Sequence, residues 1–334
     1  MPRRRNRVQA ECRAATTAYS TRLRDFRVGF RLQKASHTAT FRAALAGVAN
    51  EDDMSTVPTS TGDNLEPSRQ MWASRVTTFA REGARNTRYY AAALVDLVAP
   101  GEGAHVLDIA TGTGVVAVAA AQRVGPTGTV VATDFVAEWA PYVAETAAEA
   151  GVTNVTFEVM SAEALALPDD AFDAVFCQFG LMFVPDKLLA LREMHRVLKP
   201  GGTLGLAVWS VAERVGLFTV AGMIGAALPP TPGPPPPSPL SLGEPGLIER
   251  LVAEAGFREV AAQPFTHSYD VPSAEAEWER WTSDLSNPLT ARLVELPPDE
   301  RDALRERVLA VLETRRVGDV IRISSEAIFV TARR

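Results

Sequence analysis

The stretch Val106-Leu-Asp-Ile-Ala-Thr-Gly-Thr-Gly114 decides the fold of this chain. A short apolar run contains an acid and then turns through two glycines into the Ala-rich segment 115–121. This order predicts a buried strand, a tight turn and a helix start, the place where an α/β fold holds a nucleotide-like ligand. Gly112 and Gly114 let the backbone bend sharply and come close to a ligand. We therefore expect a ligand site at the carboxyl end of this strand, beside Asp108.

Strands and helices alternate regularly on both sides of this turn. Apolar runs predict strands at 104–109, 128–133, 154–159, 172–178 and 202–209, and helical periodicity predicts helices at 113–124, 136–150 and 186–198. Such alternation predicts a parallel sheet with helices on both faces, joined by right-handed crossovers. Lys199-Pro-Gly-Gly202 predicts a helix stop and a tight turn into the fifth strand.

The segments flanking this sheet are less regular. Trp72, Tyr90 and other apolar residues recur at helical intervals through 68–98, and a predicted helix at 212–228 leads into the Pro-rich run 229–239, which favours extended polyproline II. Further helices are predicted at 244–255, 273–285 and 298–315, and strands at 260–269 and 320–332. We interpret 68–98, 210–245 and 265–318 as elements that build or cover the site.

The first 67 residues differ in composition from the rest. Residues 1–53 are rich in Arg, Ala, Thr and Ser, and 54–67 form a polar linker. A disordered or non-native extension, a transit peptide and an RNA-binding arm all fit this composition, and we favour the extension. The folded domain is expected to cover 68–334, with its cofactor half at 100–210.

Charge, cysteines and hydropathy exclude several classes of protein. The net charge is −6, yet residues 1–50 hold eleven Lys and Arg against two acids, so the remaining chain is strongly acidic. An acidic body argues against nucleic acid as a partner, because affinity for phosphate backbones comes from clustered cations. Two cysteines make no disulfide framework and favour a cytoplasmic location. No apolar run approaches the ~20 residues needed to span a membrane.

Two ligands fit the glycine turn. Gly112–Ala117 matches the dinucleotide pattern G-x-G-x-x-G/A, and Asp134 follows Gly114 by twenty residues, so a nicotinamide oxidoreductase is an alternative. Asp108 argues against it, because a carboxylate beside the turn would repel a pyrophosphate. It suits a ligand with an amino acid end and a sulfonium, and S-adenosylmethionine is such a ligand. The chain also lacks an obvious Tyr-x-x-x-Lys pair for hydride transfer.

Four further motifs follow in order. They are Ala132-Thr-Asp-Phe135, the segment 161–173 (SAEALALPDDAFD), Cys177-Gln-Phe-Gly-Leu-Met-Phe-Val-Pro-Asp186 and the segment 191–202 (LREMHRVLKPGG). Together with Val106–Gly114 they resemble class I S-adenosylmethionine-dependent methyltransferases of the ubiquinone/menaquinone-biosynthesis type. The resemblance covers about 100–210 with high specificity. It implies an α/β fold: a Rossmann-like, doubly wound, mostly parallel sheet of seven strands with an antiparallel strand near the C-terminus, plus helical and Pro-rich insertions.

The resemblance also implies roles for single residues. Asp108 and the backbone of Ala110, Thr111, Gly112 and Gly114 match the site of the methionine end. Asp134 matches the acid that accepts both ribose hydroxyls through charge-assisted bonds. Phe135 matches the apolar residue against adenine, and Ala162 the residue whose backbone N–H meets the ring. Gln178 and Phe179 complete the expected cofactor site.

This chain departs from the family pattern at two positions. Ser161 stands where many members have an Asp that accepts from the adenine amino group, so the grip on adenine is weaker or comes partly from Glu163. Ala110 replaces the first glycine of the usual turn, and alanine is common there in similar sequences.

The acceptor side carries fewer signals. The apolar end of the fourth strand, with Met182 and Phe183, favours a small, moderately apolar acceptor such as a quinone or a secondary metabolite. Trp72, Tyr90 and Trp209 are candidate walls of its pocket, and His267 is the candidate general base. The four histidines are scattered without ligand spacing, so no metal is expected. We expect a monomer or homodimer; a cyclase, or a protein that uses the cofactor only structurally, is the alternative function.

Overall fold

The structure is a computed structural model that describes residues 66–230, 237–284 and 287–334. These residues belong to one compact unit, Ser60–Arg334. The predicted extension and linker lie outside the described residues up to position 65, as do Cys12, His37 and the centre of the Pro-rich run.

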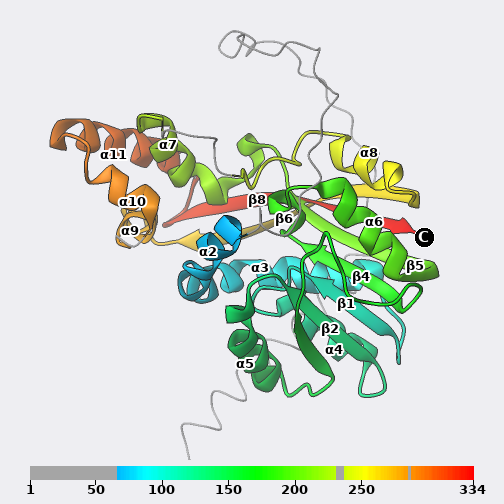
Figure 1. The fold of residues 1–334 in the computed structure, drawn as a ribbon. Coiled ribbons are helices and arrows are strands. Elements are labelled where there is room, and N and C mark those ends of the chain that lie inside the picture. Colours follow the sequence, from blue (N-terminus) through cyan, green and yellow to red (C-terminus); the bar gives the residue numbers. More distant parts are fainter. Residues whose placement is uncertain (1–65, 231–236, 285–286) are drawn as a thin grey trace, which may run out of the picture. The chain divides into compact units, whose positions relative to one another are not determined.

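One mixed sheet organises the unit, with strand order β3-β2-β1-β4-β5-β8-β6 (Figure 1). Its strands are β1 (His105–Ile109), β2 (Thr129–Asp134), β3 (Val155–Val159), β4 (Phe172–Gln178), β5 (Leu198–Trp209), β6 (Arg258–Val271) and β8 (Val320–Arg333). Strands β1 to β5 pair in parallel, whereas β8 runs antiparallel to both β5 and β6. The predicted seven-stranded, mostly parallel α/β fold is confirmed; a two-residue strand, β7 (Arg316–Val317), additionally pairs with β8.

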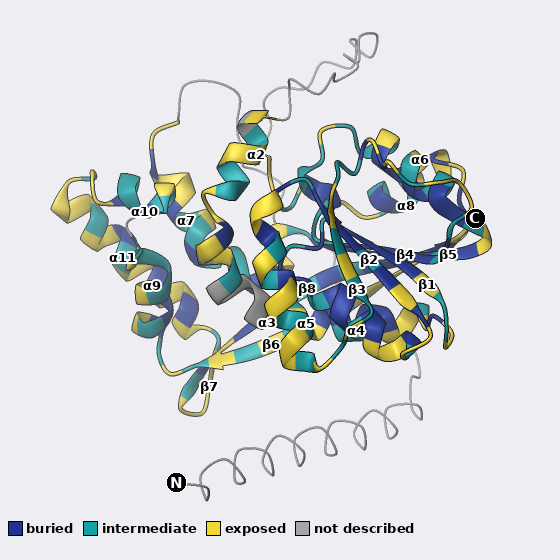
Figure 2. Cartoon of the chain, turned by 60° about the horizontal axis from the view of Figure 1, so that its bottom comes forward, coloured by how far each residue is buried: buried dark blue, intermediate teal, exposed yellow. Residues whose placement is uncertain are grey.

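Helices cover both faces of the sheet (Figure 1). One face carries α3 (Val76–Val98), α4 (Val115–Val124) and α5 (Ala140–Ala150), and the other carries α6 (Lys187–Val197) and α8 (Leu247–Glu254). Because both faces are covered, the central strands are mostly apolar, and buried residues concentrate in β1, β4 and β5 (Figure 2).

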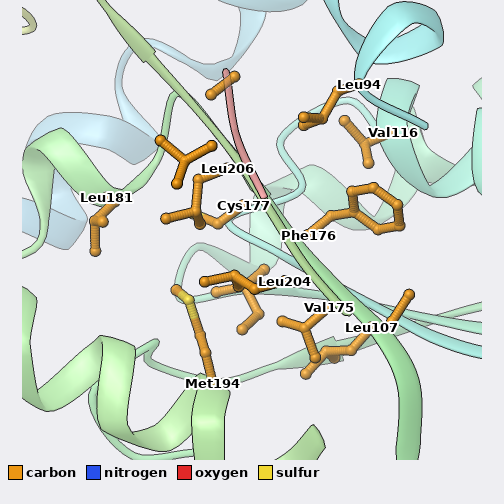
Figure 3. Close-up of a cluster of buried hydrophobic side chains, with 14 of the residues drawn as sticks. Leu94, Leu107, Val116, Val175, Phe176, Cys177, Leu181, Met194, Leu204 and Leu206 are labelled. Carbon is orange, nitrogen blue, oxygen red and sulfur yellow. The ribbon is translucent and has the colours of Figure 1, made fainter. Parts of the chain in front are cut away.

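The central strand β4 shows how this core is built. Phe176 lies beside Leu94 of α3 and Val116 of α4 on one side of β4, while Val175 lies near Met194 of α6 on the other (Figure 3). All of these side chains are buried. Burying an aliphatic or aromatic side chain of this size contributes about 1.5–3 kcal/mol, so this two-sided packing fixes the strand whose end reaches the site.

A second hydrophobic core lies at one end of the long β6–β8 pair. It is built by α7 (Thr219–Ala227), α9 (Ala274–Thr282), α10 (Pro288–Leu293) and α11 (Pro298–Glu313) (Figure 1). Helix α11 buries Leu304, Val308 and Leu312, which share one face because they are four residues apart. The predicted helix 212–228 is only partly helical: α7 covers its second half, and two short 3₁₀ turns, Ala212–Arg214 and Gly216–Phe218, precede it. Helix α10 was not predicted.

Two boundaries differ from the sequence prediction. The predicted helix 68–98 is two helices, α2 (Glu66–Ala73) and α3, with the break at Ser74 and Arg75. The predicted turn at Lys199–Gly202 lies inside β5, where the pairing with β4 shifts register between Phe172 and Ala174. Gly201 takes φ +78° there, so the irregularity is absorbed within the strand as a bulge.

Candidate functional site

The glycine turn between β1 and α4 adopts left-handed backbone at three positions. Ala110, Gly112 and Gly114 have φ values of +54°, +53° and +82°. The Thr111 N–H donates to the Thr133 carbonyl of β2 at 3.0 Å, which ties the turn to the neighbouring strand. A Cβ at Gly112 would meet no heavy atom within 4 Å, so the backbone here faces open space. The turn can therefore bring main-chain groups directly against a ligand.

Ala110 adopts this left-handed conformation although it carries a Cβ. Its Cβ fits because Gly180, after β4, has none: a Cβ built on Gly180 would lie 2.4 Å from that of Ala110. Gly180 itself has φ −95°, a conformation open to any residue. The two positions are therefore sterically complementary, and Gly180 accommodates the alanine that replaces the usual glycine.

Asp108 lies beneath the turn rather than in front of it. Its carboxylate is buried, and Oδ2 accepts from the Thr111 hydroxyl at 2.6 Å and from the Ala117 N–H at 3.0 Å. The latter N–H belongs to the first turn of α4, so Asp108 caps that helix from the strand. Burial raises the pKa of Asp108 to about 7, partly opposed by these two bonds. Asp108 lines neither of the two cavities described below, and its contact with a ligand stays a prediction.

Asp134, at the end of β2, faces the turn. Its Oδ2 accepts from the Gly112 N–H at 3.0 Å, and its Oδ1 accepts from the Val136 N–H at 3.1 Å. Burial raises the pKa of Asp134 to about 6, opposed by these backbone bonds. Each carboxylate oxygen has a second lone pair, so Asp134 can accept further bonds from a ligand while it holds the turn.

A cavity of about 640 Å³, which includes space open to solvent, lies at the carboxyl ends of β1, β2 and β4. The sequence-predicted residues in its wall come from the glycine turn, from β2 and β4 and from α2. They are Ala110, Thr111, Gly112, Asp134, Phe135, Gln178, Phe179, Phe183 and Trp72. Because ligands of open α/β sheets bind beyond the carboxyl ends of the strands, this cavity is the candidate site.

A second cavity of about 460 Å³ adjoins the first and shares Ala110, Phe135, Gly180 and Phe183 with it. Ser161 and Ala162, which follow β3, line it together with Glu163. Phe183 lies between the two cavities, with Trp72 packed edge-on against it at 4.9 Å between ring centroids. The two cavities thus form adjoining halves of one site.

Two buried acceptor atoms in these walls have no hydrogen-bond partner in the described part of the chain. One is Oε1 of Gln178, whose amide Nε2 donates to the Thr87 carbonyl at 3.3 Å. The other is Oε2 of Glu163, whose Oε1 accepts from the Asp186 N–H at 2.7 Å. A buried acceptor without a partner costs about 1–3 kcal/mol, so each atom lowers stability in the ligand-free chain.

Three predicted acceptor-site residues form a support behind the cavity rather than its wall. Tyr90 is buried, and its hydroxyl donates to the Ser325 carbonyl at 2.8 Å. Trp209 stacks on the back of Phe179, with ring centroids 4.0 Å apart. The Sδ of Met182 accepts from the Trp209 N–H. These residues line neither of the two cavities; Tyr90 and Trp209 pack against Phe179, and their role toward an acceptor stays a prediction.

His267, the predicted general base, also lies outside the cavity walls. It sits on β6 and stacks on Tyr89 of α3, with ring centroids 4.1 Å apart. Burial lowers the pKa of His267, so the imidazole is neutral at neutral pH. Its role as a general base stays a prediction. Gly114 is the remaining predicted residue outside the walls; its missing Cβ leaves room for Val143.

Sequence reasoning missed several residues that line the site. Phe79, Thr87 and Trp139 face the first cavity, and Ser68 and Met160 face the second. Trp139 lies in the 3₁₀ turn Ala137–Trp139 after β2, and Phe79 packs edge-on against it at 5.8 Å. Its position five residues after Asp134 is a usable signal, because the chain leaving a ligand-binding strand end must pass the ligand. Of the described acceptor elements, only α2 and α3 contribute to these walls.

Comparison with known proteins agrees with this geometry. The ubiE/COQ5 methyltransferase family matches residues 85–219. Nocamycin O-methyltransferase of Saccharothrix syringae is 31% identical over 72% of this chain and 89% of its own length. The ubiquinone/menaquinone biosynthesis C-methyltransferase UbiE of Pseudoalteromonas translucida is 40% identical over 40% of this chain, which spans 53% of that relative. A crystal structure of a Bacillus halodurans protein shares the fold, at 22% identity and a TM-score of 0.50 over 73% of this chain and 97% of its own.

The glycine turn, the acid at the end of β2 and the strand order are those of a class I S-adenosylmethionine-dependent methyltransferase. Within that class, the chain belongs to the ubiE/COQ5 methyltransferase family. S-adenosylmethionine is its methyl donor, as in the family, and the nicotinamide alternative is set aside. None of the described helices has both the length and the hydropathy to cross a membrane.

Proposed function

We propose that the two adjoining cavities hold the methyl donor across the ends of β1, β2 and β4. The walls fit such a ligand: the backbone at Gly112 is open, Asp134 has free lone pairs for two ribose hydroxyls, and Phe135 borders both cavities. Ala162, with its backbone N–H, lines the second cavity, where the adenine belongs in this arrangement. Asp108 then acts through the turn, which it holds in shape from below.

The acceptor, we infer, is small, neutral and moderately apolar, and it presents a hydroxyl. The observation that carries this is the unpartnered Oε1 of Gln178 in a wall otherwise rich in rings: Trp72, Phe79 and Phe179 line the same cavity. A carbonyl oxygen accepts a hydrogen bond from a hydroxyl group. It cannot form a hydrogen bond with a carboxylate or a phenolate, because these groups have no proton to donate. The likeness to nocamycin O-methyltransferase supports oxygen as the methylated atom.

When bound, S-adenosylmethionine supplies an electrophilic methyl group, so the chain itself must position the acceptor and exclude water. Gln178 orients the hydroxyl, and the rings of Trp72 and Phe79 cover the cavity from the α2–α3 side. Alignment of two reacting groups can contribute about 7–11 kcal/mol to catalysis. The C–O bond forms as the S–CH3 bond breaks, which leaves a methyl ether and S-adenosylhomocysteine, and the hydroxyl proton passes to solvent through the open side of the cavity. This arrangement assigns no proton transfer to His267.

The test is a panel of acceptors incubated with the full chain and S-adenosylmethionine, with S-adenosylhomocysteine release and product mass as readouts. Neutral phenols, enols and quinols should be methylated, whereas carboxylates should not. Gln178→Leu should lower kcat/KM for a hydroxyl acceptor by about tenfold or more, since the hydrogen bond to the acceptor is lost. Methylation of charged acceptors only, or an unaffected Gln178→Leu variant, would contradict the proposal.

The same experiment separates the alternative function. Conversion of an acceptor without release of S-adenosylhomocysteine would indicate a cyclase or a structural use of the cofactor.

Division of the chain at residue 68, a monomeric or homodimeric state and a cytoplasmic location stay predictions.

Affinity for the cofactor should depend on pH through Asp134. Its pKa of about 6 means that the carboxyl is increasingly protonated below pH 6 in the ligand-free chain. The ribose hydroxyls donate to the ionised form, so binding below that pH must expel a proton. We expect affinity for S-adenosylhomocysteine to be constant from pH 7 to 8 and to fall by up to tenfold per pH unit below about 6. Calorimetric titrations between pH 5 and 8 measure this; an affinity that stays flat down to pH 5 contradicts it.

A further inference from the structure

Arg196, in the last turn of α6, lines neither cavity, yet its guanidinium is fully engaged. It makes five hydrogen bonds, as many as it has N–H groups. Two of them go to the carboxylate of Glu193, from Nε at 2.8 Å and from Nη2 at 2.7 Å. The other three go to acceptors in the loop 160–171 between β3 and β4, which are the Leu165 carbonyl at 2.9 Å, the Leu167 carbonyl at 2.8 Å and the Asp169 carboxylate at 2.6 Å.

Glu193 holds the same loop from the acceptor side. Its Oε2 accepts from the Leu165 N–H at 2.9 Å, so Leu165 is bound to α6 through both its N–H and its carbonyl. The hydrogen bonds from Arg196 hold the pKa of Glu193 below its usual value, which keeps the carboxylate charged. Arg196 and Glu193 thus form a clamp, the α6 clamp, that joins two sequence motifs distant along the chain.

The clamped loop carries one wall of the second cavity. Residues 161–163 line that cavity, and only Ala164 separates them from the clamped Leu165. The Ala164 N–H donates to the Ser161 carbonyl at 3.1 Å, which closes this stretch into a tight turn. The opposite end of α6 binds the wall as well, because the Asp186 N–H donates to Glu163 at 2.7 Å. Both ends of one helix therefore set the position of this wall.

We propose that Arg196 is a positioning residue for the purine half of the site: it fixes the wall 161–163 in the place where its backbone groups meet the purine. This inference rests on the proposed placement of the donor across the two cavities. Arginine is the side chain that suits this role, because its planar fork serves two carbonyls and two carboxylates at once. A lysine would keep the charge, but its three N–H groups leave one nitrogen and cannot reach these acceptors together.

The experiment compares S-adenosylhomocysteine with S-ribosylhomocysteine, which lacks the purine, by displacement calorimetry on the full chain. The ratio of the two affinities isolates what the purine contributes. Arg196→Lys should weaken S-adenosylhomocysteine by about tenfold, roughly the contribution of one or two hydrogen bonds to the purine, because the wall moves away from it. The affinity for S-ribosylhomocysteine should stay that of the wild type.

A second variant and a control accompany this comparison. Glu193→Gln keeps the shape of the side chain but removes its charge and one of its two acceptor oxygens, so the ratio should shift in the same direction even if Arg196→Lys does not fold. Arg322→Lys is the matched control. Nε and Nη2 of Arg322 bond to the two carboxylate oxygens of Asp270 at 2.8 and 2.9 Å, and neither residue lines a cavity, so both affinities should be unchanged.

The outcomes separate the possible errors. Equal weakening of both ligands by the clamp variants, or an unchanged ratio, would show that the α6 clamp only stabilises the fold, and it would overturn the inference. If the wild type binds S-adenosylhomocysteine no more tightly than S-ribosylhomocysteine, or binds neither, the purine is not held in the second cavity. The proposed placement of the donor then fails, and the inference fails with it.

Discussion

Asp134→Ala is expected to weaken binding of S-adenosylhomocysteine to the full chain by at least about a hundredfold. In the proposed site Asp134 accepts two ribose hydroxyls, and each bond to a charged acceptor is worth about 1.5–3 kcal/mol. Removing both corresponds to at least two factors of ten in the dissociation constant. The substitution also frees the Gly112 N–H, which Oδ2 now holds, so the glycine turn loses one of its ties to β2. Calorimetry gives the affinity directly.

Two controls accompany this measurement. Glu158→Ala removes an exposed acid from β3, the strand next to β2, and should leave the affinity unchanged. Asp134→Asn keeps the volume of the side chain and should fold even if the alanine variant does not. Its amide lacks the negative charge, and its NH2 group faces the N–H of either Gly112 or Val136, which are both donors. It should therefore bind at least tenfold more weakly than the wild type. Wild-type affinity in either Asp134 variant would show that the ribose is not held at β2.

Gly180→Ala is expected to lower the free energy of unfolding by about 1–3 kcal/mol, the usual range for an overpacked core. The added Cβ would lie 2.4 Å from the Cβ of Ala110 and 3.1 Å from the Sγ of Cys177. Neither neighbour can give way easily: Ala110 is part of the glycine turn, and Cys177 is buried in β4. Since Gly180 and Ala110 border both cavities, affinity for S-adenosylhomocysteine should fall as well.

The double variant Gly180→Ala with Ala110→Gly separates this clash from a general loss of stability. Ala110→Gly removes the atom that the new Cβ would strike, and it also relieves a left-handed alanine, so most of the lost stability should return. Ala110→Gly alone should be close to neutral, because the relieved strain is offset by the greater freedom of glycine in the unfolded chain. Chemical denaturation of the four chains measures the coupling. Additive losses, with no recovery in the double variant, would refute the proposed fit between the two positions.

The donor half of the site is local in sequence, which is why it could be predicted. A strand, a turn with two glycines and an acid one strand later lie within about thirty residues, and parallel pairing of β1 with β2 places them together. Asp108 shows the limit of this reasoning. Its chemistry was identified, but a pattern cannot tell whether a strand-end carboxylate turns toward the ligand or toward the helix that follows. In the structure it caps α4.

The acceptor half depends on how distant segments pack. Trp72, Phe79 and Tyr90 all recur at helical intervals. Because the helix breaks between α2 and α3 and α3 packs on the sheet, Tyr90 donates to the Ser325 carbonyl, whereas Trp72 and Phe79 line the cavity. The sequence offers His267 as a base only because a histidine ordinarily titrates near neutral pH. Its position outside the cavity walls follows from the pairing of β6 with β8, and no local sequence pattern predicts that pairing.

A crystal structure of the full chain grown with S-adenosylhomocysteine tests the central claim most directly. We expect the ribose hydroxyls on Asp134, the adenine in the cavity lined by Phe135 and Ala162, and the sulfur facing Gln178 and Phe179. A ligand bound elsewhere, or bound in these cavities with its ribose away from Asp134, would contradict it.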